Sequence, residues 1–468
     1  MKRTKIICTL GPASSDEKMI KKMLENGMNV ARFNFSHGTH EYHKEMIDRF
    51  RKVRDEMGIP AAVMLDTKGP EIRLGTFKDK SVVICDGAEY TLTSRDVSGD
   101  ENIVSVSYKD LPGQLEAGDR VLIDDGMVEL SVIETTETDI ICKVVTGGKI
   151  SDRKGVNIPA KHLDFPYISK QDEADLIFGV EQHVDFVAAS FVRSKEDVIA
   201  VRNLLDYYGG HKIKIISKIE NIEGVENFDE ILSFSDGIMV ARGDMGVEIE
   251  YEKLPGLQKS FIKKCYQAGK MVITATQMLE SMIHNNTPTR AEITDVANAV
   301  FDGTSAVMLS GETAMGAHPD LAVSVMAKIA RQAENDAFSL GNYDYDNNED
   351  DIANAICDAA CTTARDIHAA AIIAVTISGS TARGVSKFRP NEIIVAATPD
   401  VQTFHQLALS WGVYPVKALM QNDADSLLLH AIACAKKDGY VKDGDRVVIT
   451  AGNGGVTNLL RVEIVNRK

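Results

Sequence analysis

The sequence predicts an α/β protein built on a (β/α)8 TIM barrel, with an inserted all-β lid domain and a C-terminal α/β domain. Strand and helix patterns alternate at the start of the chain and again after Pro166, which is typical of parallel sheets. The two stretches together hold eight strand patterns, the number of a closed barrel. Short alternating strands without a long helical pattern fill the interval, which indicates a separate β domain.

The first alternating stretch contributes three strands and two helices to the predicted barrel. Short runs of β-branched and apolar residues mark the strands. The first helix is opened by Ser15 and closed by Gly27, because glycine readily takes the left-handed position after a helix. The expected strands are Lys5–Leu10, Val30–Ser36 and Ala61–Asp66, and the second helix is Glu41–Met57.

The inserted β domain begins at Gly69-Pro70 and ends near Phe165-Pro166. Asp-Gly and Gly-Gly turns separate its short strands. The expected strands are Ser81–Ile84, Glu89–Thr93, Ile103–Val106, Arg120–Ile123, Met127–Ile133 and Ile140–Val145.

Strand–helix alternation then supplies five more barrel strands and a third domain. The polar, acidic segment Leu340–Asp351 is expected to link the two, so the predicted domains are 1–69 with 167–339, 70–166, and 340–468. The expected barrel strands are Phe186–Phe191, Lys214–Glu220, Gly237–Ala241, Met271–Thr276 and Ala306–Ser310, with helices at Lys195–Tyr208 and Glu252–Ala268. The third domain has apolar strands at Ala371–Ile377, Ile393–Ala397 and Val447–Thr450.

Composition and charge exclude several classes of protein. The 468 residues are 44% hydrophobic and 26% charged, which is ordinary globular usage. A net charge of −16 argues against a nucleic-acid partner, because phosphate backbones require a positive surface. Seven cysteines without a Cys-x-x-Cys pair fit a reducing compartment. The apolar run that ends at Leu10 is too short for a signal peptide, and no window approaches the ~20 apolar residues of a membrane span. We therefore expect a cytoplasmic protein without a membrane partner.

Polar residues that interrupt the barrel strands gather at the C-terminal strand ends, where TIM barrels carry their active sites. Lys218 and Glu220 are two positions apart on one strand, so both side chains should point into the barrel mouth. The residues identified at this rim are Arg32, Asn34, Ser36, Asp66, Thr67, Lys68, Ser190, Lys218, Glu220, Arg242, Asp244, Thr276 and Glu312.

Glu220 and Asp244 are candidate ligands of Mg²⁺, which typically takes one or two protein carboxylates together with substrate oxygens. Asp244 lies beside Gly243 and Gly246, which let the backbone approach a ligand. A buried ion pair between Lys218 and Glu220 is the alternative to a functional role for these two residues.

Arg32, Arg73 and Lys218 are cations in an acidic protein, and beside a carboxylate-held Mg²⁺ they indicate a phosphate-bearing substrate. The sequence has no Walker A motif and no protein-kinase Gly-rich loop, so a nucleotide would be held in another way. His37 and His40 flank Gly38. Such histidines are often loop or core residues, and His37 is the one that we favour as a ligand.

Five segments resemble those of pyruvate kinases, and the resemblance covers essentially the whole chain. It implies transfer of a phosphoryl group from phosphoenolpyruvate to ADP, giving pyruvate and ATP in the last step of glycolysis. It also implies Mg²⁺ or Mn²⁺ and K⁺ as cofactors, and a homotetramer. The segments are ARFNFSHG (31–38), LDTKGPEIR (65–73), ISKIEN (216–221), ARGDMG (241–246) and TATQML (274–279).

The resemblance further implies roles for individual residues. Lys218 would neutralise charge on the transferring phosphoryl group, and Thr276 would help to place the proton that turns enolpyruvate into pyruvate. Substrate would be bound by Arg32, Lys218, Thr276 and the backbone at Gly243 and Asp244, and Mg²⁺ would be bound by Glu220 and Asp244. Nucleotide would be bound by Asn34, His37, Arg73 and, from the closing lid, Lys154. K⁺ would be bound by Asn34, Ser36, Asp66 and Thr67.

One further residue of these segments bears on the monovalent ion. Relatives that work without K⁺ resemble this sequence but carry Lys at the position of Glu71. A lysine could supply the positive charge of the ion, whereas glutamate cannot. We therefore expect K⁺ dependence.

A loop in the third domain matches the family's effector loop. It follows an apolar strand and precedes a helix near Ala382, so its hydroxyl and N–H groups could cradle a phosphate. The alternative is that Ser380 or Thr381 simply caps the helix. The segment 451–458 lacks the basic or aromatic clamp of relatives activated by a bisphosphorylated sugar. We expect a sugar monophosphate or AMP as activator, or only a weak response to fructose 1,6-bisphosphate, at Thr376, Ser378, Gly379, Ser380 and Thr381.

Two other functions compete with this interpretation. A metal-dependent lyase or aldolase acting on pyruvate-like substrates would need the enolate site but no nucleotide, and the lid with Lys154 together with Arg73 speaks against it. A catalytically silent metabolite-binding protein should lack at least one of four key side chains. All four are present: Lys218, Glu220, Asp244 and Thr276.

Overall fold

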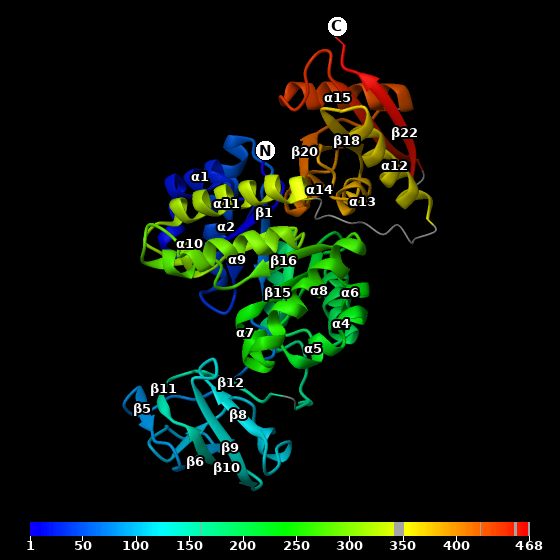
Figure 1. Ribbon diagram of the computed structural model, residues 1–468. Helices are drawn as coiled ribbons and strands as arrows, with labels where there is room; N and C mark the ends of the chain where they lie inside the picture. Colours follow the sequence, from blue (N-terminus) through cyan, green and yellow to red (C-terminus); the bar gives the residue numbers. More distant parts are fainter. Residues whose placement is uncertain (160, 341–350, 422, 454–455, 467–468) are drawn as a thin grey trace.

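Eight parallel strands close into a barrel, as predicted, in the order β1-β17-β16-β15-β14-β13-β3-β2. The computed structural model describes residues 1–159, 161–340, 351–421, 423–453 and 456–466 (Figure 1). The predicted linker therefore lies largely outside the described residues. The barrel strands are β1 (Lys5–Thr9), β2 (Val30–Asn34), β3 (Ala62–Asp66), β13 (Phe186–Ala189), β14 (Lys214–Ile219), β15 (Gly237–Ala241), β16 (Met271–Ala275) and β17 (Ala306–Leu309).

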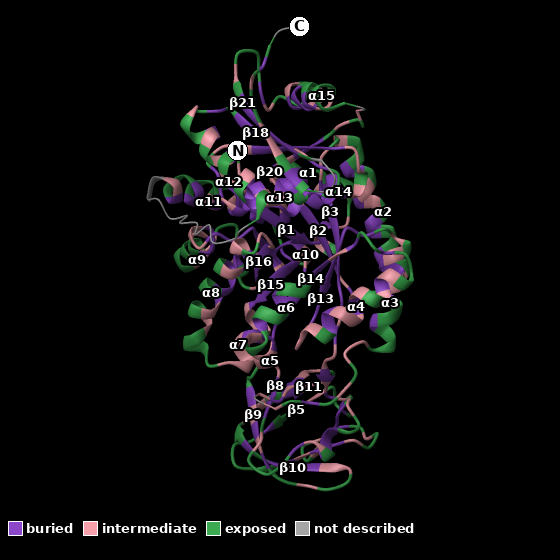
Figure 2. Cartoon of the chain, turned by 90° about the vertical axis from the view of Figure 1, so that its right-hand side faces the viewer, coloured by how far each residue is buried: buried purple, intermediate pink, exposed green. Residues whose placement is uncertain are grey.

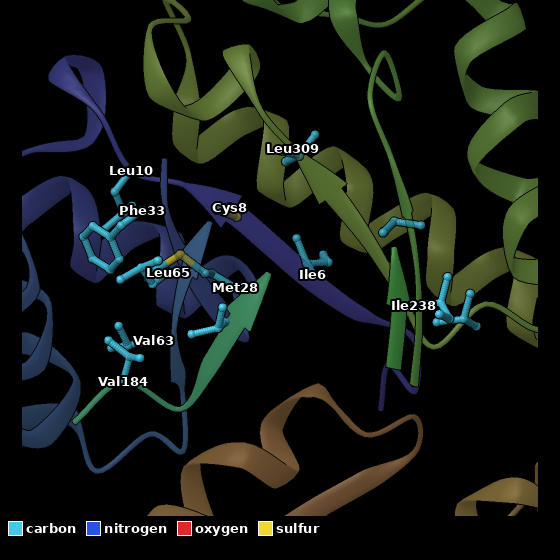
Figure 3. Packing of buried hydrophobic residues seen from close by; sticks show 14 of the residues in the cluster. Ile6, Cys8, Leu10, Met28, Phe33, Val63, Leu65, Val184, Ile238 and Leu309 are labelled. Atoms are coloured by element: carbon cyan, nitrogen blue, oxygen red, sulfur yellow. The ribbon is translucent and has the colours of Figure 1, made fainter. Parts of the chain in front are cut away.

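The barrel strands are apolar on both faces because each face packs against a different core. Inward-facing side chains such as Met64 and Met239 fill the barrel interior. Outward-facing side chains such as Val63, Leu65 and Ile238 pack beneath the surrounding helices (Figure 3). Polar residues such as Asn34 and Asp66 end these buried strands, which is why the rim pattern could be read from the sequence.

The barrel helices follow the expected order, with small shifts at their ends. The first begins one residue later than predicted, because Asp16 and not Ser15 is its N-cap and accepts a hydrogen bond from the N–H of Met19. Gly27 ends it in the left-handed conformation, as predicted, with φ 114°. The helices are α1 (Glu17–Asn26), α2 (His40–Met57), α3 (Lys170–Glu181), α4 (Lys195–Tyr207), α5 (Ile222–Glu226), α6 (Phe228–Phe234), α7 (Arg242–Glu248), α8 (Leu254–Gln267), α9 (Arg290–Phe301), α10 (Gly311–Ala314) and α11 (Pro319–Leu340).

The inserted segment forms a sheet in the order β4-β12-β8-β9-β10-β6-β7 and a separate pair β11-β5. An isolated bridge between Leu74 and Val106 joins the two edges of the larger sheet. Three of these strands were not predicted: one has only two residues, and each of the other two begins with glycine, which is depleted in strands. They are β4 (Ile72–Arg73), β11 (Gly148–Ser151) and β12 (Gly155–Asn157), beside β5 (Ser81–Ile84), β6 (Glu89–Thr93), β7 (Ile103–Ser105), β8 (Arg120–Ile123), β9 (Val128–Thr135) and β10 (Asp139–Thr146).

The C-terminal sheet has the order β20-β19-β18-β21-β22, with only β22 antiparallel to its neighbour. The sequence reading missed β20, which contains Pro415, and β22, in which polar residues such as Asn458 and Arg461 interrupt the apolar run. The elements are α12 (Ile352–Asp366), β18 (Ala371–Val375), α13 (Ser380–Lys387), β19 (Ile393–Thr398), α14 (Val401–Gln406), β20 (Val413–Lys417), α15 (Ala424–Lys437), β21 (Arg446–Asn453) and β22 (Val456–Ile464). Within the described part of the chain, no helix is both long and apolar enough to cross a membrane.

The lid and the C-terminal sheet lie at opposite ends of the barrel (Figures 1 and 2). At the N-terminal strand ends, the N–H of Gly412 donates to the carbonyl of Arg3 at 3.0 Å, and Leu409 joins the barrel interior. At the other end, Asn157 of the lid donates to Glu248 of α7 at 2.9 Å. The lid therefore faces the C-terminal strand ends, where the predicted site residues lie.

Candidate active site

Lys218 lies at the centre of a buried polar cluster at the barrel rim. Strand alternation brings it beside Glu220, as predicted, with 2.9 Å between Nζ and Oε1. Its Nζ also lies 3.1 Å from Asp66 Oδ1 and donates to Ser190 Oγ at 2.8 Å. The ion pair considered as the alternative to a functional role thus exists, as one part of a larger cluster that spans β3, β13 and β14.

Arg32 belongs to the same cluster through Asp66. The strands β2 and β3 are neighbours, and Arg32 Nε lies 2.6 Å from Asp66 Oδ2. A second guanidinium nitrogen of Arg32 donates to Thr9 Oγ1 at 2.8 Å. Two cations therefore share one carboxylate at the mouth of the barrel, and both side chains are close to fully buried.

The charges in this cluster shift each other's pKa. Burial alone would raise the pKa of Asp66, but the charges of Arg32 and Lys218 outweigh it and lower that pKa. Burial alone would lower the pKa of Lys218, but Asp66 and Glu220 raise it. Asp66 is thus held as an anion and Lys218 as a cation. A permanent positive charge at this position suits an anionic substrate.

Glu220, which is buried, and Asp244, which is partly buried and lines the cleft beneath the lid, form a pair of carboxyl groups. Glu220 accepts a hydrogen bond from the N–H of Phe191 at 2.7 Å, and Asp244 is hydrogen-bonded to Glu220. Burial raises the pKa of Glu220 to about 7, against the opposing charge of Lys218, and burial also raises the pKa of Asp244. Two carboxyl groups that are costly to ionise side by side fit a divalent cation, which would compensate both charges.

Thr276 follows β16 in a left-handed backbone conformation, with φ 71°, and Gln277 has φ 54°. The Oγ1 of Thr276 accepts a hydrogen bond from the N–H of Gly243 at 2.8 Å and donates one to the carbonyl of Ala275 at 2.6 Å. The structure therefore brings together two predicted elements of the substrate site, the Thr276 hydroxyl and the start of α7. A β-branched residue in this region of backbone space is rare and is held there by its surroundings.

The lid contributes a cleft wall, but its two predicted phosphate ligands are turned to other partners. Arg73 makes two contacts of 2.8 Å with the carboxylate of Glu71, and Lys154 lies 2.7 Å from Asp124. Arg73 thus does not join Arg32 and Lys218, contrary to the expected convergence of three cations. The cleft between lid and rim is lined by residues of both, among them Glu71, Asp125, Asn157, Phe191, Asn221 and Asp244.

The four predicted K⁺ ligands lie at the ends of neighbouring strands. Asn34 pairs in register with Asp66, and its side-chain oxygen accepts from the N–H of Ser36 at 3.1 Å. Thr67 Oγ1 accepts from the N–H of Ser190 at 3.1 Å. The candidate ligand atoms of these four residues are all oxygens, which suits a hard monovalent cation. Asp66 also forms ion pairs with two cationic side chains. His37 is exposed, while the neighbouring His40 contacts Asp175 at 2.6 Å.

The predicted effector loop connects β18 to α13. Gly379 precedes the helix with φ 83°, and neither Ser380 nor Thr381 caps it, so the capping alternative is wrong. Thr381 is buried and bonded to Thr457 at 2.8 Å, whereas Ser378 and Ser380 are exposed. Arg383 donates to the carbonyl of Ser378 at 3.0 Å. The sequence reasoning had not counted this cation beside the loop.

Sequence reasoning also missed some cluster members. Ser190 was recognised only as one of the rim residues, and the N–H of Phe191 and the hydroxyl of Thr9 were not considered. Thr9 is the last residue of β1, so the same strand-end rule could have found it. A backbone donor such as the N–H of Phe191 leaves no signal in a sequence.

A TIM barrel whose rim holds two buried cations and a carboxyl pair beneath a separate lid is typical of enzymes that act on phosphorylated substrates. Comparison with known proteins identifies the family within this class. A family model described as "Pyruvate kinase, barrel domain" matches residues 1–323, and one described as "Pyruvate kinase, alpha/beta domain" matches residues 354–463. The chain belongs to the pyruvate kinase family.

Curated relatives agree over nearly the full length. A pyruvate kinase of Clostridium acetobutylicum is 46% identical over 476 residues, covering 99% of this chain and 100% of its own. One of Clostridium perfringens is 46% identical over 479 residues, with the same coverage. One of Staphylococcus haemolyticus is 47% identical over 473 residues, covering 99% of this chain and 81% of its own.

Proposed function

We propose that this chain catalyses transfer of the phosphoryl group of phosphoenolpyruvate to ADP, giving pyruvate and ATP, the final step of glycolysis. The observation that supports this most is the buried cluster in which Arg32 and Lys218 share Asp66 beside the carboxyl pair of Glu220 and Asp244. The test is pyruvate formation from phosphoenolpyruvate and ADP. Pyruvate is measured by coupling its formation to the oxidation of NADH by lactate dehydrogenase. Absence of pyruvate formation in a folded, metal-supplied sample would refute the proposal.

In this proposal the cluster binds the phosphoryl group and compensates its charge. Arg32 and Lys218 are pre-oriented by Asp66, so their positive charges need no reorganisation when charge moves during transfer. Lys218 stays protonated throughout because two carboxylates raise its pKa. Glu220 and Asp244 would hold Mg²⁺ or Mn²⁺, which supplies charge neutralisation between the substrate oxygens when bound.

In the same proposal, Thr276, Gly243 and Asp244 contact the part of the substrate that carries the carboxylate and C3. The backbone at Gly243 and Asp244 would receive its carboxylate. After transfer, the enolate of pyruvate would be protonated at C3 near the Thr276 hydroxyl, which already lies within 2.8 Å of the Gly243 nitrogen.

Nucleotide binding would involve Asn34, His37, Arg73 and Lys154. Arg73 lies on β4 and Lys154 directly precedes β12 of the lid, and their partners Glu71 and Asp124 would release them as the lid closes. We also propose that the protein is a cytoplasmic homotetramer. Its domain boundaries are proposed at 69/70, 166/167 and 339/340.

We expect activity to depend on K⁺. In a buffer with tetramethylammonium in place of K⁺, turnover should fall at least about tenfold, or about 1.4 kcal/mol of transition-state free energy. The reason is that Glu71 faces the cleft with a negative charge, where a lysine could have replaced the ion's charge. Glu71→Lys should reduce the dependence, and Glu89→Lys, at an exposed lid position, should not. Full activity of the unaltered chain without K⁺ would contradict this.

We expect activation by a monophosphorylated ligand at the loop 376–381, and at most a weak response to fructose 1,6-bisphosphate. The loop offers two exposed hydroxyls, on Ser378 and Ser380, with Arg383 beside them. The measurement is activity at sub-saturating phosphoenolpyruvate with a sugar monophosphate, AMP or the bisphosphate added in turn.

Replacement of Ser378, Ser380 and Thr381 by alanine should abolish the activation, whereas Ser233→Ala, at an exposed position of α6, should leave it unchanged. Strong activation by the bisphosphate that survives the triple replacement would sink the idea.

A further inference from the structure

Arg242, the first residue of α7, ties the turn that carries Thr276 to two helices outside the barrel. Its Nε donates to the carbonyl of Ala275 at 3.1 Å, and its Nη2 donates to the carbonyl of Thr276 at 2.6 Å. Its Nη1 donates to Asp295 of α9 at 2.7 Å and to Gln258 of α8 at 3.4 Å. The Arg242 side chain is only 12% exposed. One guanidinium thus fixes the peptide groups on both sides of Thr276.

This support acts on a segment that needs it. Thr276 and Gln277 are consecutive non-glycine residues with positive φ, a conformation that costs free energy and persists only where neighbours hold it. Arg242 is also followed directly by Gly243, whose N–H donates to the Thr276 hydroxyl. The same segment therefore sets both the backbone and the hydroxyl of Thr276.

We propose that Arg242, anchored by Asp295, is a positioning residue for the protonation of enolpyruvate. This rests on the proposed function. In that reaction the bond between phosphorus and the enol oxygen breaks as one to an ADP oxygen forms, which leaves the enolate. A proton from solvent then reaches C3 by way of the Thr276 hydroxyl, and the enolate oxygen becomes the carbonyl oxygen of pyruvate. Arg242 acts on the second step through Thr276 and touches none of the reacting atoms.

The test separates protonation from phosphoryl transfer. The protonation half is followed by NMR as exchange of the pyruvate methyl protons with D₂O, in the presence of Mg²⁺, K⁺ and ATP. In Arg242→Met, this exchange and kcat should fall about 10²-fold, the cost of misplacing a reacting group by about 1 Å. The KM for phosphoenolpyruvate should change little, and the solvent deuterium isotope effect on kcat should rise, because protonation becomes rate-limiting.

Three further variants keep the test decisive. Arg242→Lys should recover part of the exchange, since an ammonium group can still reach a carbonyl. Asp295→Asn keeps the shape of the anchor but removes its charge, and it should also slow proton exchange. This variant tests the proposal even if Arg242→Met does not fold. Lys259→Met, which breaks the ion pair to Asp302 on the same two helices, should leave exchange and kcat unchanged.

Some outcomes overturn only this inference. An active unaltered chain whose Arg242→Met and Asp295→Asn variants keep normal proton exchange would show that Arg242 is merely structural. An Arg242→Met variant that loses phosphoenolpyruvate affinity, with an unchanged isotope effect, would show the same. By contrast, an unaltered chain that forms no pyruvate from phosphoenolpyruvate and ADP would refute the proposed function itself.

Discussion

Lys218→Met is expected to lower kcat about 10²–10³-fold, the usual cost of removing one preorganised charge from a transition state. Lys218 is held between Asp66 and Glu220, so its charge is already oriented when negative charge builds up on the phosphoryl oxygens. Methionine has nearly the same length but no charge. The measurement is steady-state turnover at saturating phosphoenolpyruvate, ADP, Mg²⁺ and K⁺.

Stability has to be measured in the same variant. The sequence analysis placed Lys218 at a rim position, and the structure shows it buried with two carboxylates, so its loss leaves charge unpaired in the interior. Urea unfolding therefore accompanies the kinetics. Lys214→Met is the matched control, because Lys214 lies at the opposite end of the same strand and pairs with Asp236 at 2.9 Å. A folded Lys218→Met variant with near-normal turnover would show that Lys218 is only an ion-pair partner.

Glu220→Gln is expected to lower turnover more than about 10²-fold and to weaken divalent metal binding. Glutamine keeps the shape and can still accept the hydrogen bond from Phe191, but the carboxyl pair with Asp244 loses one of its two potential charges. Mg²⁺ prefers charged oxygen ligands. The direct readout is Mn²⁺ affinity by electron paramagnetic resonance, in the absence of substrates.

Glu226→Gln provides the control for this second variant, because Glu226 is an exposed glutamate on α5 close to the same rim. It should bind Mn²⁺ as the unaltered chain does. If Glu220→Gln bound Mn²⁺ with unchanged affinity, the metal would have to be held elsewhere.

The barrel could be predicted because its strands are short, apolar and bounded by polar residues, so that counting them gave the fold. Alternation also brought Lys218 and Glu220 together correctly, since Lys218 lies on β14 and Glu220 directly follows it, so no knowledge of tertiary structure is needed. Strand-end residues could be assigned to one rim because parallel strands share a direction.

Contacts between elements could not be predicted in this way. The sharing of Asp66 by Arg32 and Lys218 depends on which strands are neighbours in the closed barrel. Arg73 was expected beside the other cations. Instead it forms a salt bridge with Glu71, which lies two residues earlier in the chain. The left-handed conformation of Thr276 could not be foreseen either, because threonine rarely adopts it.

The most direct test of the central claim follows the phosphoryl group itself by ³¹P NMR. The unaltered chain is mixed with phosphoenolpyruvate, ADP, Mg²⁺ and K⁺. We predict that the phosphoenolpyruvate signal is replaced by the γ-phosphate signal of ATP in step with pyruvate formation, and that neither change occurs without ADP. Loss of phosphoenolpyruvate without ADP, release of inorganic phosphate in place of ATP, or no reaction at all would contradict the assignment of this chain as a phosphotransferase.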